Sequence, residues 1–366
     1  MSAPAAAELE RAYRGKRVLL TGHTGFKGSW LTLWLESLGA EVFGFSLAPE
    51  TPQWLFAAGG LERHCRHALG DVRDFAAVEK RVREVKPDFV FHLAAQALVR
   101  RSYAQPVETL AANVMGTAHV LEAMRAVGAP ARVIIVTSDK CYENREQEAG
   151  YREEDAMGGF DPYSMSKGAA ELVTASWRRS FFPVERLAQH GVAVASARAG
   201  NVIGGGDWAE DRIVPDIVRS LHGGKPVPVR SPKSIRPWQH VLEPLSGYLL
   251  LGARLEGKDA AATMEAWNFG PRAEASRTVR ELVEAMIASW GGGRWEDQSK
   301  PDAPHEAKVL RLSIEKATKR LGWAPRWGFD ETVRRTTEWY RAQMGGAKAD
   351  ELVKLCRADI AAYQLA

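Results

Sequence analysis

Cysteine is scarce in this sequence, which argues against a disulfide-stabilised fold. Among 366 residues there are three cysteines, Cys65, Cys141 and Cys356, which form no CxxC pair and cannot all pair with one another. Disulfide-dependent domains are small and cysteine-dense, whereas a chain of this length can bury enough surface to need neither disulfides nor a structural metal. The sequence therefore predicts a protein of a reducing compartment, without a metal site.

Long apolar runs and blocks of like charge are also missing. No apolar stretch approaches the roughly 18 residues of a membrane span, and residues 1–14 carry Glu8 and Glu10 among alanines, unlike a signal peptide. Lysine and arginine (49) exceed aspartate and glutamate (45) by only four. We therefore expect a cytoplasmic protein that binds neither a membrane nor nucleic acid.

What the sequence does contain is a regular alternation of apolar runs and helical patterns. Strands are predicted at residues 17–21, 41–47, 88–93, 132–137 and 192–197. Helices are predicted between them at residues 27–38, 78–85 and 113–127. This order indicates βαβ units, so we expect an α/β fold: a Rossmann-like, doubly wound parallel sheet with helices on both faces. Ligands of such sheets bind at the carboxyl ends of the strands.

The regular pattern ends near Gly200, after which prolines and glycines, including those at 291–293 and 301–304, divide the chain into shorter elements. We expect a smaller mixed α/β domain there. The predicted division is an N-terminal extension at 1–14, a Rossmann-like domain at 15–200 with a return segment around 236–270, a second domain from 201–235 and 271–345, and a tail helix at 346–366.

A glycine-rich turn follows the first predicted strand and opens the next helix. Its GxxGxxG pattern consists of Gly22, Gly25 and Gly28. Gly22 allows a tight turn, Gly25 lets a pyrophosphate approach the backbone, and Gly28 lets helix and strand pack closely. A turn without a ligand is the alternative, but the position between strand and helix favours a dinucleotide.

The second predicted strand lacks the acidic residue that usually holds the adenosine ribose. Ser46 occupies that place, and no arginine follows it closely, which argues against a 2′-phosphate pocket and favours NAD. Asp71, in the segment 70–74, is a candidate contact for the adenine amino group. An exposed N-capping aspartate is the alternative.

Tyr163 and Lys167 are four residues apart in a predicted helix and so share one face. For tyrosine to act as a base near pH 7, its pKa must fall about three units, and a neighbouring ammonium, helped by a positively charged nicotinamide ring, lowers it. Alone, this pair is more often a surface feature. However, the 132–137 strand leads into Ser138, Asp139 and Lys140, which offer a shared hydrogen bond, a proton donor and a proton acceptor at the ligand-binding edge.

Together these motifs resemble the extended short-chain dehydrogenase/reductase superfamily, in its nucleotide-sugar branch. The carriers are the glycine loop, His92-Leu-Ala-Ala95, Ser138 and Tyr163-x-x-x-Lys167. More narrowly, four segments resemble the CDP-glucose 4,6-dehydratases: TGHTGFKGSW at 21–30, TSDKCY at 137–142, RAGNVIGGGDW at 198–208 and RPWQHV at 236–241. The resemblance covers about residues 13–345.

The resemblance implies a NAD-binding Rossmann-like domain, a smaller domain that holds CDP-glucose, and a homodimer formed through helices near 113–127 and 163–178. Members of the branch oxidise glucose at C4, eliminate water across C5 and C6, and return the hydride to C6. The product is a 4-keto-6-deoxyhexose for deoxysugar biosynthesis, such as that of lipopolysaccharide O-antigens. The order has a chemical reason, because the C5 proton becomes acidic only beside a ketone and hydroxide leaves only when protonated.

The resemblance also implies roles for individual residues. Tyr163 would remove the C4 hydroxyl proton with the help of Lys167 and Ser138, and Asp139 would protonate the leaving C6 oxygen. Lys140 stands where dTDP-glucose dehydratases have a glutamate. Removal of the C5 proton and polarisation of the C4 oxygen both stay open for it, since a lysine becomes a base only when burial makes it neutral.

Binding residues follow from the same motifs. The expected cofactor contacts are Gly22, Thr24, Gly25, Phe26, Gly28, Asp71, Val72, Leu93, Ala94, Ala95, Tyr163 and Lys167. For the substrate, Gln96 is expected near the hexose, and Asn201 and Arg236 near the diphosphate, although a surface arginine remains the alternative for Arg236. His305 and Glu306 match the family's nucleotide-contacting loop only loosely. Tryptophans such as Trp290, Trp323 and Trp339 are expected in the core.

Other functions compete with this hypothesis. A nucleotide-sugar 4-epimerase needs the same tyrosine, lysine and NAD, but epimerases have small or neutral residues in the places of Asp139 and Lys140. A 4,6-dehydratase for another nucleotide-glucose would differ only in nucleotide recognition. A catalytically silent NAD-sensing protein typically lacks the tyrosine or the lysine, and both are present here.

Overall fold

The computed structural model describes residues 3–147, 149–299 and 310–366, so the predicted loop at 301–304 and the residues His305 and Glu306 lie outside the described residues. Its helices are α1 (Ala3–Tyr13), α2 (Phe26–Ser37), α3 (Leu55–Ala58), α4 (Phe75–Val85), α5 (Val99–Ala104), α6 (Pro106–Leu110), α7 (Gly116–Val127), α8 (Pro162–Ser180), α9 (Leu187–His190), α10 (Ile213–His222), α11 (Leu242–Glu256), α12 (Ala260–Thr263), α13 (Val279–Trp290), α14 (Phe329–Met344) and α15 (Ala349–Leu365). Its strands are β1 (Arg17–Thr21), β2 (Glu41–Phe45), β3 (Phe89–His92), β4 (Ala131–Val136), β5 (Val192–Ala199), β6 (Val202–Ile203), β7 (Val227–Val229), β8 (Ile235–Pro237), β9 (Gln239–His240), β10 (Ala266–Phe269), β11 (Ser276–Thr278) and β12 (Trp295–Asp297).

A six-stranded parallel sheet lies at the centre of the molecule. Its order is β2-β1-β3-β4-β5-β10, and each adjacent pair runs parallel. Outside β2, Arg66 and Leu69 form isolated parallel bridges to Phe43 and Ser46, which extend the sheet by a short edge segment. The predicted α/β fold with a parallel sheet is confirmed.

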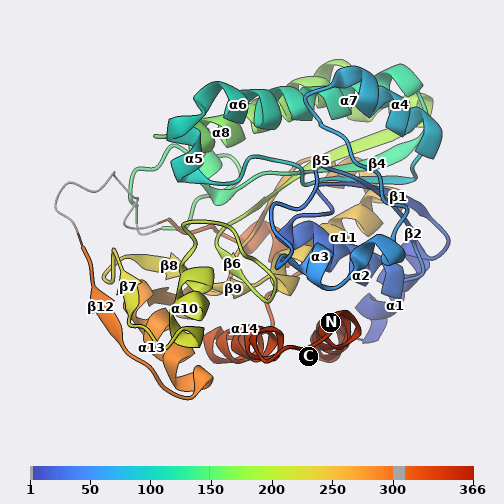
Figure 1. Cartoon of the computed structure of the whole chain (residues 1–366). Helices are drawn as coiled ribbons and strands as arrows, with labels where there is room; N and C mark the ends of the chain where they lie inside the picture. The colour runs from blue at the N-terminus through green and yellow to red at the C-terminus, as the bar shows by residue number, and fades with distance from the viewer. Residues whose placement is uncertain (1–2, 148, 300–309) are drawn as a thin grey trace.

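Helices cover both faces of this sheet, as Figure 1 shows. The helices α4, α7 and α8 form one layer, and α2 and α11 pack on the other face. A parallel strand is therefore covered on both sides, which explains why the predicted strands read as continuous apolar runs. In β5, every residue from Val192 to Ala199 is buried. Trp323 and Trp339 are buried in the core as expected, and Trp290 packs against it while partly exposed.

One predicted helix differs at its start. The pattern at 113–127 predicts a single helix, but residues 111–115 form a wider π-helical turn and α7 begins at Gly116. Asn113 in that turn bonds out of the helix: its side chain accepts from the Gln96 N–H at 2.8 Å and donates to the Gln96 carbonyl at 3.0 Å and to Ser166 Oγ at 2.8 Å. The turn thus anchors the loop after β3 to α8.

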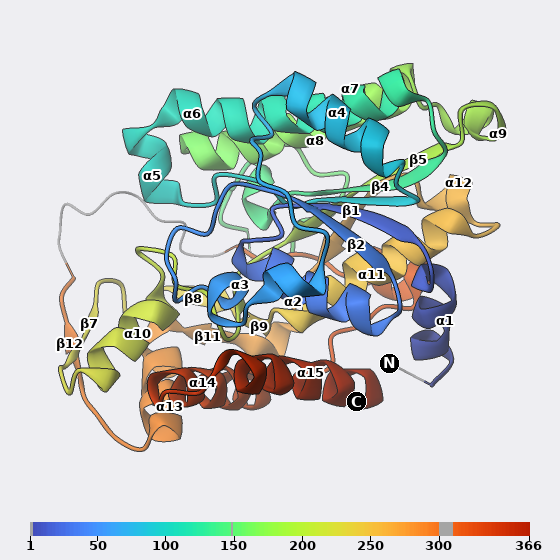
Figure 2. The same ribbon diagram turned by 45° about the vertical axis from the view of Figure 1, so that its right-hand side comes forward.

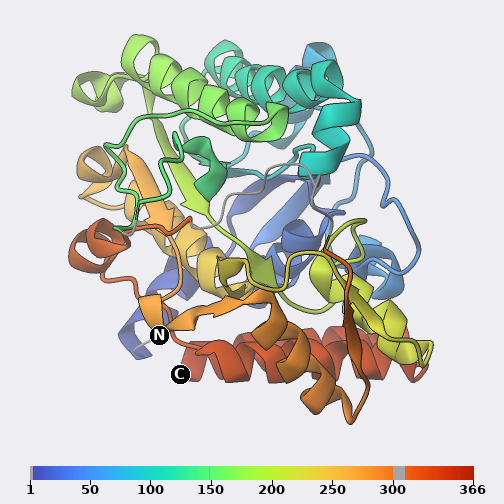
Figure 3. The same cartoon turned by 90° about the vertical axis from the view of Figure 1, so that its left-hand side faces the viewer.

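A second lobe is built from the shorter elements that follow β5. It contains α10, α13 and the small sheets β12-β7 and β11-β8, which lie together beneath the main sheet in Figure 1 and toward the viewer in Figure 3. The helices α14 and α15 run along the base of the molecule (Figure 2), where α14 packs against α13 and α15 packs against α2 and α3. These two helices therefore join the second lobe to the lobe of the main sheet.

The described residues lack several features that the sequence also lacks. None of the described helices combines the length and apolar character that crossing a membrane requires. In the same part of the chain, no three histidine, cysteine, aspartate or glutamate side chains gather in a way that could hold a metal ion. Cys65, Cys141 and Cys356 are all free thiols.

Candidate active site

A cavity of about 1480 Å³ lies between the carboxyl ends of the central strands and the second lobe. It is lined by every residue that the sequence analysis selected for catalysis or binding: Gly22, Thr24, Gly25, Phe26, Gly28, Asp71, Val72, Leu93, Ala94, Ala95, Gln96, Ser138, Asp139, Lys140, Tyr163, Lys167, Asn201 and Arg236. The structure thus brings all of these residues into one site, and their individual roles stay predictions.

The glycine loop forms the floor of one end of this cavity. Gly22 has φ = +76°, and a Cβ atom there would lie 2.6 Å from the Ala94 nitrogen, so only glycine fits. A Cβ on Gly28 would collide with the Gly22 carbonyl. Gly25 is the N-cap of α2 and has no side chain to occupy the first N–H groups of the helix. The loop therefore presents helix N–H groups and their positive dipole to the cavity, as an anion site requires.

Two polar positions near this loop are held by neighbours. Ser46 is buried and its hydroxyl lies 2.8 Å from Thr24 Oγ1, while Thr24 donates to the Leu47 carbonyl. Asp71 pairs with Arg73 at 2.6 Å, which holds the pKa of that carboxyl below its usual range. The N-cap of α4 is Asp74, which accepts from Ala77 N, so the alternative interpretation of Asp71 as an N-cap is wrong.

The predicted catalytic residues lie on the turn after β4 and on the first two turns of α8. Asp161 caps α8 by accepting from Ser164 N at 2.9 Å, and the following turns bury Tyr163 and Lys167. Ser138 hydrogen-bonds the Tyr163 phenol and donates to Asp139 Oδ1 at 2.9 Å. Hydroxyl, phenol and carboxyl thus form one connected group at the strand end.

Burial dominates the electrostatics of this group. It raises the pKa of Tyr163 to about 12, although the hydrogen bond with Ser138 opposes the rise; the charge of Asp139 adds to the rise and that of Arg212 lowers it. Burial also lowers the pKa of Lys167 to about 8. The protein's own side chains therefore do not produce the fall in the pKa of Tyr163 that a base requires. Loss of hydration destabilises the phenolate more than Ser138 and Arg212 stabilise it.

The predicted substrate residues come from three different parts of the chain. The Gln96 side chain is already bonded within the protein: it donates to Thr109 Oγ1 of α6 at 2.9 Å and to the Leu98 carbonyl at 3.0 Å, and it accepts from Leu98 N. A hydrogen bond from Gln96 to a hexose would require an exchange of these partners. Asn201 follows β5 and Arg236 lies in β8, so two different elements bring them to the cavity.

Several charged residues of the cavity were missed by the sequence analysis. Lys27 is half-buried within the glycine loop, where burial lowers its pKa to about 7 and the charges of Arg212 and Lys167 add to this effect. Arg212 pairs at 3.0 Å with the buried Asp207. Two features of the sequence could have revealed these residues: Lys27 lies inside the GxxGxxG pattern, and Asp207 lies inside the 198–208 motif.

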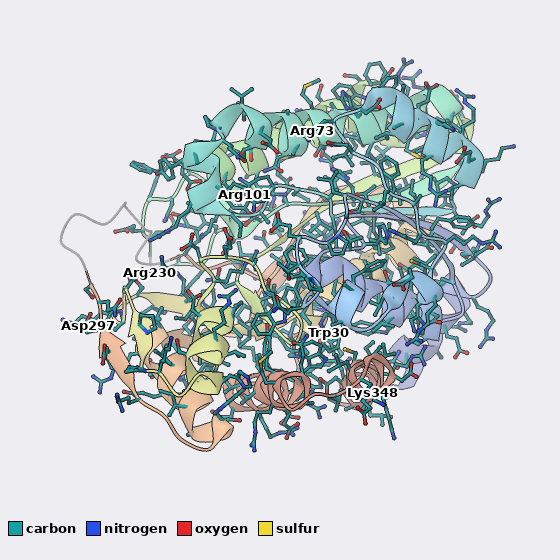
Figure 4. All side chains as sticks on the ribbon, viewed as in Figure 1. Trp30, Arg73, Arg101, Arg230, Asp297 and Lys348 are labelled. Atoms are coloured by element: carbon teal, nitrogen blue, oxygen red, sulfur yellow. The ribbon has the colours of Figure 1, made fainter. Side chains whose placement is uncertain are left out.

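Two further arginines line the cavity from opposite lobes, and both are labelled in Figure 4. Arg101 belongs to α5 and pairs with Glu50 at 2.6 Å. Arg230 follows β7 and pairs at 2.8 Å with Asp211, which also contacts Arg100 of α5 at 3.2 Å. The cavity is thus rich in arginine on both sides, which suits an anionic ligand.

Comparison with known proteins places this site in a family. The family model described as GDP-mannose 4,6 dehydratase matches residues 19–336. The CDP-glucose 4,6-dehydratase of Salmonella typhimurium (strain LT2) is 52% identical over 334 residues, which cover 91% of this chain and 93% of that protein.

Solved structures share the fold at lower identity. The dTDP-glucose 4,6-dehydratase of Streptomyces venezuelae, solved with NAD bound, has a TM-score of 0.75 at 24% identity and covers 90% of this chain and 98% of its own. The UDP-glucose 4-epimerase of Stenotrophomonas maltophila, also solved with NAD, has a TM-score of 0.77 at 22% identity, with 91% and 100% covered. With a family model matched over most of its length and a relative sharing half of its residues, the chain belongs to the GDP-mannose 4,6-dehydratase family.

Proposed function

We propose that this protein is a NAD-dependent CDP-glucose 4,6-dehydratase, a hydro-lyase. The observation that carries the proposal is the convergence of Tyr163, Ser138, Asp139 and Lys140 in one cavity, in a chain 52% identical to a protein of that name. A tyrosine and a lysine alone suit any dehydrogenase of this fold. The adjacent carboxyl and ammonium groups add the acid–base pair that elimination of water requires.

NAD fits the residues present. A Cβ atom on Gly22 or Gly28 would collide with the backbone of Ala94 or of Gly22, so these glycines keep the loop tight, and Gly25 has no side chain that would cover the start of α2. Gly22, Gly25 and the first N–H groups of α2 would hold the diphosphate, and the Asp71 segment would hold the adenine. When bound, NAD supplies the acceptor for the C4 hydride and its donor at C6. Its oxidised ring also brings the positive charge needed to lower the pKa of Tyr163 from about 12.

The side chains of the protein then move protons at defined atoms. Tyr163 takes the proton of the C4 hydroxyl, while Lys167 stabilises the phenolate and Ser138 holds the oxygen by a hydrogen bond. The C4 ketone acidifies the proton on C5, which Lys140 would accept, and Asp139 delivers a proton to the leaving oxygen on C6.

The cavity also suits the diphosphate of CDP-glucose. Asn201 and Arg236 line it beside the missed cation Arg212, which Asp207 holds in place. A guanidinium pairs with two phosphate oxygens at once, so arginine is well suited to this contact. The lobe of the main sheet would bind NAD, and the second lobe, which contains α10 and α13, would bind the CDP part of the substrate.

A substrate screen tests this function directly. The purified protein is incubated with NAD and one of CDP-, dTDP-, GDP- or UDP-glucose in each sample. The masses of the products are then measured by mass spectrometry. We expect loss of one water from CDP-glucose without net accumulation of NADH, and no reaction with the Tyr163→Phe variant. Conversion to an isomer of unchanged mass would indicate an epimerase. Dehydration of another nucleotide-glucose instead would show that the substrate carries a nucleotide other than CDP.

We also infer a homodimer, formed through the outer surface of α6 to α8. Val107, Met115, Met165 and Leu172 on these helices are 78%, 50%, 40% and 62% exposed, and the helices pack against one another at the top of the view in Figure 1. Large apolar side chains gathered on one layer are typical of a protein interface.

The free cysteines support our inference of a cytoplasmic enzyme that supplies deoxysugar biosynthesis, including that of O-antigens.

A further inference from the structure

One buried carboxylate lies directly behind the catalytic turn. Glu171 follows Lys167 by one turn of α8 and is 5% exposed. It accepts hydrogen bonds from Thr137 Oγ1, from Ser196 Oγ at 2.7 Å and from Arg198 Nη2 at 2.8 Å. Although burial opposes ionisation, the charge of Arg198 and these bonds keep the pKa of Glu171 below its usual range. The carboxylate is thus a fixed, fully bonded anion.

Its partners connect it to both ends of the turn that carries Ser138, Asp139 and Lys140. Thr137 immediately precedes Ser138, and it is bonded to Glu171 directly. Beyond the turn, Tyr142 is bonded through Arg198, whose Nη1 lies 2.6 Å from the Tyr142 hydroxyl. Glu171 and Arg198 therefore hold residues 137 and 142, and the catalytic turn spans the distance between them.

The same network continues to β10 and to the segment that precedes α8. Tyr142 donates to Asn268 Oδ1 at 2.8 Å, and Arg198 Nη1 donates to the Glu153 carbonyl at 3.1 Å. Arg198 also precedes Gly200, which lies so close to Asp139 that a Cβ atom there would be 2.7 Å from Asp139 Oδ2. The position of the Asp139 carboxyl is consequently defined by β4, β5 and α8 together.

We propose that Glu171 and Arg198 act as positioning residues, which hold the turn 138–141 so that Asp139 and Lys140 are presented to the sugar at a fixed depth. The proposal rests on the proposed dehydratase function, because it explains how the acid–base pair of that reaction is oriented. Neither residue lines the cavity, so their effect on catalysis is exerted through Thr137 and Tyr142.

Removal of a buried charge could unfold the protein, so the test uses two neutral donors to the same carboxylate. Thr137→Val and Ser196→Ala each delete one buried hydroxyl bonded to Glu171, but only Thr137 adjoins the catalytic turn. We expect Thr137→Val to lower kcat by roughly 10- to 100-fold with KM for CDP-glucose unchanged, and Ser196→Ala to stay within about threefold of the wild type. Thr137→Ser keeps the hydroxyl and should restore kcat.

Hydrogen exchange provides a readout that needs no turnover. The amides of Lys140 and Cys141 are bonded to Ser138 Oγ and to the Ser138 carbonyl within the turn. We expect exchange in the peptide covering 138–142 to accelerate in Thr137→Val and to match the wild type in Ser196→Ala. Equal exchange in both variants, or an equal loss of kcat in both, would overturn the proposal. Absence of any product from wild-type CDP-glucose turnover would instead reject the dehydratase function, and the exchange result would still decide the positioning role.

Discussion

At the scale of single residues, Tyr163 illustrates a site that is incomplete without its ligands. Its phenol is buried and its pKa is raised to about 12, so a smaller fraction of it is ionised at neutral pH than of a tyrosine in water. The groups that oppose this effect are the Ser138 hydroxyl and the more distant Arg212. Lowering this pKa requires added positive charge, and we propose that the oxidised nicotinamide ring of bound NAD supplies it beside Lys167.

Asp139 offers the sharpest test of the reaction at this scale. Asp139→Asn cannot give up a proton to the C6 oxygen but keeps a similar shape beside Ser138. We expect C4 oxidation to persist, seen as enzyme-bound NADH, while loss of water slows by roughly 100-fold, a typical contribution of general acid catalysis.

The two half-reactions are measured separately by NADH absorbance in a single turnover and by the mass of the product. Ser164→Ala is a suitable control, because its hydroxyl belongs to the same region but bonds to the cap residue Asp161. An equal decline of oxidation and dehydration in Asp139→Asn would remove Asp139 from the acid role.

The residues found by sequence were those with a fixed spacing along the chain. Gly22, Gly25 and Gly28 belong to one strand-to-helix connection and Tyr163 and Lys167 to one helix face, so the local pattern was sufficient. Arg212 was not found, because it reaches Tyr163 only through folding of a loop beyond β6. The rise in the pKa of Tyr163 that burial causes in the chain without cofactor was not foreseen either, since spacing gives no measure of burial.

At the scale of elements, the strands of the main sheet and the helix α2 were predictable. The sheet is covered on both faces and α2 is largely buried, which leaves a strong apolar signal in the sequence. The predicted strand at 17–21 coincides with β1, whereas the predicted helix at 113–127 missed the π-helical turn. That turn depends on the bonds of Asn113 to Gln96 and Ser166, which involve residues far away in sequence. The edge bridges of Arg66 and Leu69 likewise have no periodic signal.

A buried glutamate couples the element α11 to the C-terminal helix. Glu243 is fully buried, accepts from the backbone N–H groups of Arg326 and Trp327, and accepts from the Tyr363 hydroxyl of α15 at 2.6 Å. Burial nevertheless raises the pKa of Glu243 to about 7. The folded protein therefore binds a proton here that the unfolded chain releases near pH 4.5.

This linkage gives a pH-dependent stability with a defined sign. Below the unfolded pKa, the group is protonated in both states; as pH rises toward 7, its contribution to stability is lost, by about 3 kcal/mol for a shift of this size. Glu243→Gln does not titrate, so the wild type should be favoured over the variant more strongly at pH 5 than at pH 8. Denaturant unfolding at both values measures the difference, and the same gap at both would contradict the assignment.

At the scale of the whole molecule, the exposed apolar side chains of α6 to α8 predict a dimer that one charge can separate. Leu172→Arg places a guanidinium in the middle of that surface, where it would lose its hydration on association. We expect the variant to sediment as a monomer while the wild type sediments as a dimer. Leu365→Arg, on the exposed end of α15, changes an equally apolar residue elsewhere and should leave the dimer intact.

The sheet itself is completed by a strand from late in the chain. After β5, the polypeptide builds α10, β7 and β8 of the second lobe before β10 returns to pair with β5 in register, Ala266 opposite Ser196. A fragment that stops near residue 205 would thus retain the glycine loop but leave the apolar strand β5 unpaired on one side, as an open rim of the sheet. Such a rim recruits strands from other chains, so the first half of the protein should aggregate when it is synthesised alone.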